Sequence, residues 1–361
     1  MAASECNTVV KNWPKIFICG YNPFNLNENG SPVEIKLCDY VATKPASNDE
    51  PFLLEITCTH AVLAVGNRLY AQSALTMQSN EASFSSRIVQ ISASTWHCLV
   101  LLENGDLFKY DFGNNRSVCL EFLSAESTDS ELSSTEREKI THIACGDRMS
   151  VAVTCRKAVF SIPSRIFSFP RHVRVAQVAV GLEHCLLLTS NGDVYSWGGG
   201  LRGQLGNGEI TLHQELPQLV EALAGVKIVH IAAGGWHSVA VSSFGDLYSW
   251  GWNSKGQLGI LDEKRQKGSV FLLPQLIEFN DEVSLEKVFC GIEHTLAIDS
   301  KNEIYFSGNN LQTRLDYTKV NTLPSLVGFK KLETDPMLDS KFIVKSAANS
   351  IIFMEKTSLD I

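Results

Sequence analysis

Four histidines recur in the same local setting in this 361-residue chain, and histidines placed at regular intervals could hold a metal ion. His97, His184, His237 and His294 each precede an apolar run, and an aromatic residue stands eleven positions after each of them. Because the four belong to separate copies of one phrase, each should repeat the same local role. We predict a structural side chain that hydrogen-bonds within its own repeat unit, against the alternative of a zinc ligand, and we expect no metal.

Motifs for nucleophilic catalysis or phosphate binding are not found in the sequence. There is no Gly-x-Ser-x-Gly element and no glycine-rich loop that ends in Lys-Ser or Lys-Thr. The ten cysteines include no Cys-x-x-Cys pair, which favours reduced thiols in a cytosolic or nuclear protein. We therefore expect no catalytic residue, no cofactor and no enzyme activity.

One copy of the phrase carries cations where another carries turn-forming residues. Arg156 and Lys157 stand where that copy has Asn191 and Gly192, so both are expected at the tip of a hairpin. The unit then continues into residues 163–171 instead of a glycine-rich half. One interpretation is a decayed repeat with a solvated basic turn. The other makes Arg156 and Lys157 candidates for partner binding or modification, because departures from local rules can mark function.

The phrase has a period of about 50 residues and predicts short antiparallel strands. Its clearest copies cover residues 178–198, 231–251 and 288–308, and weaker copies begin near residues 55, 91 and 143. Within a copy, Asn-Gly or a similar pair separates an apolar run from an aromatic-containing run. Such a pair predicts a β-hairpin with a type I′ turn, which needs positive φ at both central residues.

The two ends of the chain supply complementary halves of one further copy. Residues 344–354 match the first half of the phrase, and residues 16–22 read like its second half. Counting them together gives seven units. A ring in which the N-terminal and C-terminal strands pair in one unit explains this split and leaves few exposed sheet edges.

Bulk properties fit one globular body. We expect a polar leader at residues 1–12 and a single domain over residues 13–361, with the strongest repeats at 174–308 and a mobile Ser/Thr/acid-rich insert at 122–139. A net charge of −8 argues against a general polyanion-binding surface, so direct nucleic-acid binding is not expected. We expect neither secretion nor membrane spanning, since no signal peptide or long apolar run is found.

The Gly-x-x-His, Tyr-Ser-Trp-Gly and Gly-Gln-Leu-Gly elements resemble the regulator-of-chromosome-condensation repeat. This resemblance implies an all-β fold, a seven-bladed β-propeller. It implies an adaptor that binds a JmjC-domain 2-oxoglutarate oxygenase and influences histone lysine methylation and chromosome segregation, with Arg156 as a candidate substrate. The alternative is a guanine-nucleotide exchange factor for a Ran-type small GTPase. Histones are further possible partners, and the implied location is nuclear or cytoplasmic, with association to chromosomes.

The tryptophans can be assigned within the same framework. Trp197 and Trp250 occupy one repeat position and are predicted in the core between blades. Trp96 and Trp236 precede a motif histidine and are predicted to reach the rim of the propeller. Photoreceptors of the family use tryptophan clusters, but we favour structural roles for these residues.

Overall fold

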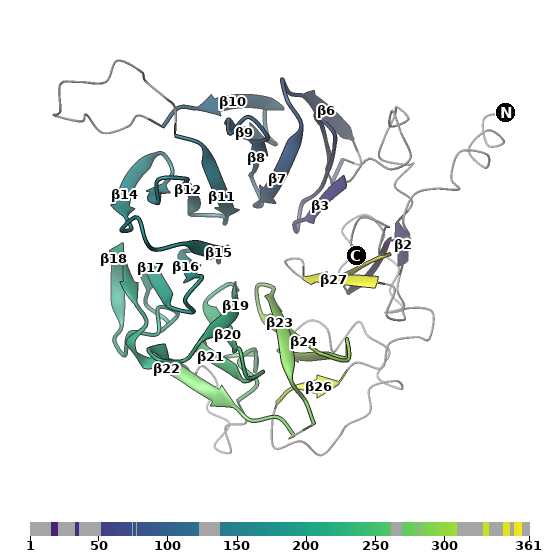
Figure 1. Ribbon diagram of the computed structural model, residues 1–361. Helices are drawn as coiled ribbons and strands as arrows, with labels where there is room; N and C mark the ends of the chain where they lie inside the picture. Colours follow the sequence, from purple (N-terminus) through teal and green to yellow (C-terminus); the bar gives the residue numbers. More distant parts are fainter. Residues whose placement is uncertain are drawn as a thin grey trace, which may run out of the picture.

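Seven four-stranded antiparallel sheets, called blades 1 to 7 here, surround a common centre (Figure 1). The computed structural model describes residues 16–20, 33–35, 52–73, 75–76, 78–122, 138–260, 269–280, 282–308, 328–331, 342–346 and 350–355. The predicted leader at residues 1–12 lies outside them, as do residues 123–137 of the predicted insert. Within the described residues, no helix is long and apolar enough to cross a membrane.

Blades 1 to 6 follow one another along the sequence. Blade 1 comprises β3 (Phe52–Ile56), β4 (His60–Val65), β5 (Arg68–Ser73) and β6 (Ser79–Ser83). Blade 2 comprises β7 (Ile88–Ala93), β8 (His97–Leu102), β9 (Leu107–Asp111) and β10 (Arg116–Leu120). Blade 3 comprises β11 (Ile140–Cys145), β12 (Ser150–Thr154), β13 (Ala158–Ser161) and β14 (Ser164–Ser168). Blade 4 comprises β15 (Val175–Val180), β16 (His184–Thr189), β17 (Val194–Gly200) and β18 (Thr211–Leu219). Blade 5 comprises β19 (Ile228–Ala233), β20 (His237–Ser242), β21 (Leu247–Trp252) and β22 (Val270–Ile277). Blade 6 comprises β23 (Leu285–Cys290), β24 (His294–Asp299), β25 (Ile304–Gly308) and β26 (Lys330–Lys331). A short 3-10 helix, η4 (Glu221–Leu223), joins blades 4 and 5.

Blade 7 combines the two ends of the chain. It is built from β2 (Val33–Ile35), β1 (Ile16–Gly20), β28 (Ser350–Glu355) and β27 (Phe342–Ser346), in that order. β1 and β28 are antiparallel, from the pair Ile16 and Met354 to the pair Gly20 and Ser350. The predicted sharing of one blade by the N-terminal and C-terminal strands is therefore confirmed.

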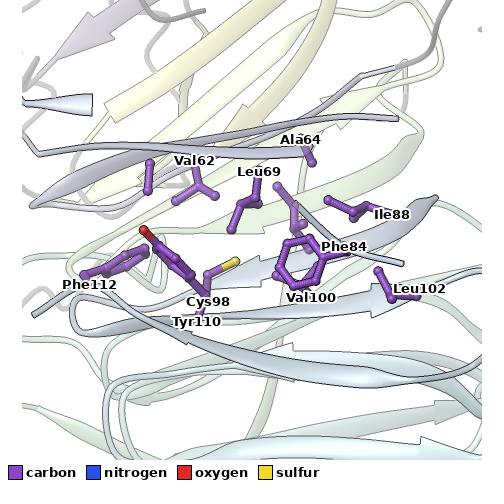
Figure 2. Packing of buried hydrophobic residues seen from close by; sticks show 12 residues of the cluster. Val62, Ala64, Leu69, Phe84, Ile88, Cys98, Val100, Leu102, Tyr110 and Phe112 are labelled. Atoms are coloured by element: carbon purple, nitrogen blue, oxygen red, sulfur yellow. The ribbon is translucent and has the colours of Figure 1, made fainter. Parts of the chain in front are cut away.

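The hydrophobic core lies between blades, not inside one of them. In blades 1 to 6 the first strand of each blade packs against the first strand of the next, from β3 to β23. In blade 7 the strand in this position is β27, which packs against β23. Each apolar cluster then draws side chains from two successive blades. In the layer between blades 1 and 2, Val62 and Leu69 of one blade meet Cys98, Val100 and Tyr110 of the other (Figure 2). This arrangement explains why the middle strands are apolar on both faces.

A tight turn joins the first and second strands of blades 1 to 6. In each of these turns, the backbone N–H three residues before the motif-histidine position donates to the carbonyl of the residue at that position, which is Met149 in blade 3. The donor–acceptor pairs are Thr57–His60, Ser94–His97, Gly146–Met149, Gly181–His184, Gly234–His237 and Gly291–His294. The weak copy at residues 55–70 is thus in register at its histidine. Its hairpin is one residue shorter because Val65 and Arg68 pair directly across Gly66 and Asn67.

The hairpins between the second and third strands differ from the predicted type. In blade 4, Gly192 N donates to Thr189 O at 3.0 Å, and Gly192 has a φ of 100°. Asn191 is not in the positive-φ region, so the predicted type I′ turn is wrong. The chain instead makes a turn with one left-handed residue at its end, a three-residue hairpin loop that is also common.

The Gly-x-x-His element is explained by close approach at the centre of the ring. A Cβ on Gly181 would lie 2.6 Å from Cε1 of His184 and would also collide with the carbonyl oxygen of Gly234 in the next blade. Gly234 is in turn confined by His237 and by Gly291 O. Glycine is thus required at this position because the imidazole of the same motif and the backbone of the next blade occupy the space that a side chain would need.

Gly234→Ala should lower the free energy of unfolding by about 1–3 kcal/mol, because its Cβ would lie 2.7 Å from Gly291 O and collide with the His237 ring. Urea denaturation followed by tryptophan fluorescence measures the loss. Gly113→Ala is the control, since its Cβ would be 3.3 Å from an exposed Asp111 oxygen, and the expected change is below about 0.5 kcal/mol. Equal stabilities for the two variants would contradict this account of the motif.

Candidate functional site

Three of the motif histidines, in blades 2, 4 and 5, connect their blade to the one that follows it. Each stands at the start of a second strand and is buried. Nε2 lies 3.0 Å from Ser150 Oγ for His97, 2.8 Å from Ser238 Oγ for His184, and 2.9 Å from Thr295 Oγ1 for His237. The partner is the residue after the motif position in the next blade, so it can be read from the sequence once the direction of the contact is known.

The predicted hydrogen bond within the same unit is wrong for His184 and His237. The turn of their own blade offers only a glycine to the ring, and Nδ1 of these two histidines has no hydrogen-bond partner among the described residues. Blade 2 has Ser94 at the turn position instead, and there His97 Nδ1 lies 3.2 Å from Ser94 Oγ. The side chain that the turn provides thus decides whether Nδ1 has a partner in its own blade, whereas Nε2 reaches the next blade in all three cases.

The serine hydroxyl fixes the protonation of His184. Ser238 Oγ donates its one proton to Gln204 O at 2.8 Å, so it must accept a hydrogen bond from His184 Nε2–H. Gln204 O also accepts the indole N–H of Trp250, at 2.9 Å. The Gly-Gln-Leu-Gly element supplies this carbonyl, the Tyr-Ser-Trp-Gly element supplies Trp250, and the Gly-x-x-His element supplies His184, which is linked to the carbonyl through Ser238. Thr295 and Gln257 O repeat the hydroxyl contact one blade further on, at 2.7 Å.

Trp197 and Trp250 lie between blades, fully buried. Trp197 packs among side chains of blades 3 and 4, and Trp250 among side chains of blades 4 and 5. Trp96 lies on the surface with 67% of its area exposed. Trp236 is half-buried, in a cluster that the sequence did not reveal.

That cluster lies on the face formed by the turns between first and second strands. The Arg202 guanidinium stacks on the ring of Trp236 at 3.9 Å and on that of Trp252 at 4.5 Å. Trp236 Nε1 donates to Glu183 Oε1 at 3.0 Å, and Glu183 also pairs with Arg148 at 3.1 Å. A cation between two indoles is stabilised by their π faces, so this cluster orders the connection between blades 4 and 5.

A cavity of about 250 Å³ opens at the centre of the same face. It is lined by the tight turns, including Thr57, Ser94, Gly146, Gly181, Gly234 and Gly291. Hydrogen bonds in one rotational direction link successive turns: Thr59 Oγ1 to Thr95 O, Thr95 N to Asp147 Oδ1, Arg148 N to Leu182 O, Leu182 N to Gly235 O, and Gly235 N to Ile292 O. Among the residues described here, no group of three or more His, Cys, Asp or Glu side chains is arranged to hold a metal ion.

Arg156 and Lys157 lie on the opposite face, in the turn between β12 and β13. Lys157 N donates to Thr154 O at 3.0 Å, and Lys157 has a φ of 69°. The Arg156 side chain is 62% exposed and pairs with Glu138 at 3.9 Å. The structure does not bring these two cations together with the histidines or tryptophans, which belong to the interior and to the other face.

Known proteins match the repeats described above. The model of the regulator of chromosome condensation (RCC1) repeat matches residues 191–241 and 245–298, and a second model of that repeat matches 175–204 and 228–257. Residues 175–298 of this chain therefore contain repeats of the RCC1 type. RCC1 domain-containing protein 1 of Homo sapiens is 46% identical over 122 residues, covering 34% of this chain and 32% of that protein. Its Mus musculus counterpart is 55% identical over 89 residues, covering 24% and 23%. The matches thus span about a third and a quarter of these relatives.

Two solved structures share the fold over nearly the whole chain. Prp20p of Saccharomyces cerevisiae has a TM-score of 0.68 and 16% sequence identity, covering 98% of this chain and 94% of that one. Human WBSCR16 has a TM-score of 0.64 and 18% identity, covering 96% and 99%. These neighbours support the β-propeller predicted from the sequence.

Blade 3 differs from the RCC1 repeat, and as a result one buried tryptophan of the core lacks a hydrogen-bond partner in the part of the chain that the structure describes. Trp250 donates its indole N–H to the Gly-Gln-Leu-Gly segment of the preceding blade, at Gln204 O. Trp197 faces blade 3, where residues 163–171 replace that segment, and its buried Nε1 has no hydrogen-bond partner among the described residues. An unsatisfied buried donor costs about 1–3 kcal/mol.

Trp250→Phe should therefore destabilise the propeller more than Trp197→Phe, by about 1 kcal/mol. Both changes remove similar apolar volume, but only Trp250 loses a hydrogen bond. Urea denaturation followed by far-ultraviolet circular dichroism measures both variants without relying on the deleted fluorophore. A larger loss for Trp197→Phe would show that packing, and not the indole N–H, distinguishes the two sites.

Stability should also fall as the pH drops below about 6.5, where an unfolded histidine becomes protonated. Burial lowers the pKa of His184 and His237 to about 3, with repulsion from neighbouring histidines adding to the effect at His237. Burial likewise lowers the pKa of His97 and His294 to about 4.

Between pH 6.5 and these values the unfolded chain binds more protons than the native one, so each histidine subtracts up to about 1.4 kcal/mol per pH unit. Thermal melts from pH 7.5 down to pH ~5 measure the slope, with exposed His172→Gln as the control. A flat profile would contradict the neutral, buried assignment.

Proposed function

We propose that this chain is a non-enzymatic adaptor that binds a JmjC-type 2-oxoglutarate oxygenase. Through that partner it would influence histone lysine methylation and chromosome segregation, in association with chromosomes. The resemblance of the repeats supports this proposal, as does the likeness to RCC1 domain-containing protein 1. A rigid ring with loops on two faces suits a binding role, because such loops hold contact residues in fixed positions.

The observation that carries the proposal is the display of Arg156. Its backbone is held by a hairpin in which Val151–Ser161 and Val153–Val159 are paired residues of β12 and β13. Its side chain projects with 62% of its area exposed, and its ion pair with Glu138 is long, at 3.9 Å. The guanidinium is therefore open to solvent although its partner Glu138 is largely buried, so an enzyme could reach it without displacing other side chains.

We expect the oxygenase to hydroxylate Arg156 in the presence of iron, O₂ and 2-oxoglutarate. One oxygen atom would convert an aliphatic C–H bond of the arginine into C–OH, and the other would enter succinate as 2-oxoglutarate loses CO₂. Intact mass and peptide fragmentation locate the added oxygen. Arg156→Lys should abolish the addition, whereas Arg116→Lys, on an exposed strand of blade 2, should leave it unchanged. Addition at another residue, or none, would overturn the assignment.

Partner identity is tested separately by a tagged pull-down from nuclear extract. Recovery of a JmjC oxygenase is the expected result, and it should weaken when the blade 3 turn is replaced by the sequence of the blade 4 turn. The second candidate is an exchange factor for a Ran-type GTPase, which the shared fold of Prp20p favours, a protein described with binding to Gsp1p and histones. Recovery of such a GTPase, with faster release of labelled GDP from it, would replace the adaptor proposal.

A further inference from the structure

The hairpin turns of blades 2 to 6 have equal length, so their residues can be compared one by one. In each turn a backbone N–H donates to the carbonyl three residues earlier, at 2.9–3.0 Å. The donors are Gly105, Lys157, Gly192, Gly245 and Asn302. Lys157 therefore takes the position that glycine or asparagine takes in the other four blades.

The same alignment shows a reversal of charge in blade 3. The residue after the donor is Asp106, Asp193, Asp246 or Glu303 in blades 2, 4, 5 and 6, but it is Ala158 in blade 3. Thr154 Oγ1 accepts from Ala158 N at 3.1 Å just as Thr189 Oγ1 accepts from Asp193 N, which fixes the equivalence. Blade 3 has thus lost the carboxylate and gained Arg156 and Lys157.

Cations on the flanking segments extend this turn into a patch. Lys139 O accepts from Cys155 N at 2.8 Å, and Lys157 O accepts from Phe169 N at 3.0 Å, so both flanking segments lie against the turn. The blade-3 cation patch consists of Lys139, Arg156, Lys157, Arg171 and Arg174, of which all but Lys157 are exposed. Among the described residues of these segments, Glu138 is the one acid, on a chain whose net charge is −8.

The backbone of Lys157 is strained in a way that the glycine turns of blades 2, 4 and 5 avoid, whereas blade 6 has Asn302 at this position with a φ of 62°. Its φ of 69° lies in the left-handed region, where a residue with a Cβ costs about 1 kcal/mol more than glycine. Glycine takes this position in blades 2, 4 and 5. A strained residue that persists where a relaxed one would fit is a sign of a role outside the fold.

We propose that the blade-3 cation patch is a docking site for an acidic, extended protein segment. The patch is narrow, because the turns on either side carry Asp106 and Asp193. A nucleic-acid duplex laid across this face would meet those carboxylates, whereas a single peptide strand can stay on blade 3. The inference rests on charge and geometry, and it does not require the oxygenase or the modification of Arg156.

The test uses the full chain and a fluorescein-labelled peptide of alternating Glu and Ser, with a Gln-Ser peptide as the neutral comparison. Fluorescence anisotropy should show preferential binding of the acidic peptide that weakens as salt is added. Lys157→Gly should weaken binding by up to about fivefold, since one exposed charge pair is worth up to about 1 kcal/mol. The same change should raise the midpoint of urea unfolding, so misfolding cannot account for the loss.

Two matched variants complete the design. Asn302→Gly makes the corresponding backbone change in blade 6 without altering charge, and it should leave peptide affinity unchanged. Arg174→Ser should weaken binding, whereas Arg87→Ser should not. The carbonyls of Arg174 and Arg87 occupy equivalent positions, accepting from Ser190 N at 2.8 Å and from Glu103 N at 2.9 Å.

Three results would overturn the proposal. The first is equal affinity for the acidic and neutral peptides. The second is wild-type affinity in both Lys157→Gly and Arg174→Ser. The third is tighter binding of a DNA duplex that the same two substitutions abolish, which would make the patch a nucleic-acid site instead. None of these outcomes depends on which protein the pull-down recovers.

Discussion

The carbonyl of Gln204 is the contact on which the joint between blades 4 and 5 depends. It accepts hydrogen bonds from the hydroxyl of Ser238 and from the indole N–H of Trp250. Ser238 in turn accepts a hydrogen bond from Nε2–H of His184. Both donors come from the blade that follows. A blade of this propeller is therefore not a self-sufficient unit, since its buried polar groups are satisfied only when the next blade is in place. Hydrogen bonding and apolar packing act across the same boundary, which makes neighbouring blades cooperate.

The architecture could be predicted from the sequence because the repeat consists of residues with strong local structural preferences. Glycines, apolar runs and the aromatic position gave the period, and the two half-copies at the ends predicted the shared blade that β1 and β28 form. The partner of His184 could not be predicted in the same way. A periodic pattern says that two residues recur, but it does not say whether a side chain reaches its own copy or the next, and Ser238 carries no mark of that role.

The turn chemistry was predictable in position and not in detail. Asn191-Gly192 does form a hairpin, yet only the glycine takes a left-handed conformation, because the loop has three residues and not two. The Trp236–Arg202 contact escaped prediction because its members come from different blades and separate loops. By contrast, Arg156 and Lys157 could be singled out from the sequence because they differ from the residues at the same turn positions in the other copies of the repeat.

The pairing of β1 with β28 has a consequence for how the molecule can be made. In synthesis from the N-terminus, β28 leaves the ribosome only after β1 and the six blades that lie between them in sequence. Throughout that interval β1 can pair with β2, but its other edge must wait unpaired while the intervening blades assemble. Contacts between residues so distant in sequence form slowly, and an unpaired strand is a template for aggregation. Blade 7 thus acts as a completion check: a chain truncated before β28 would expose the unpaired edge of β1, a surface that chaperones and proteases could recognise.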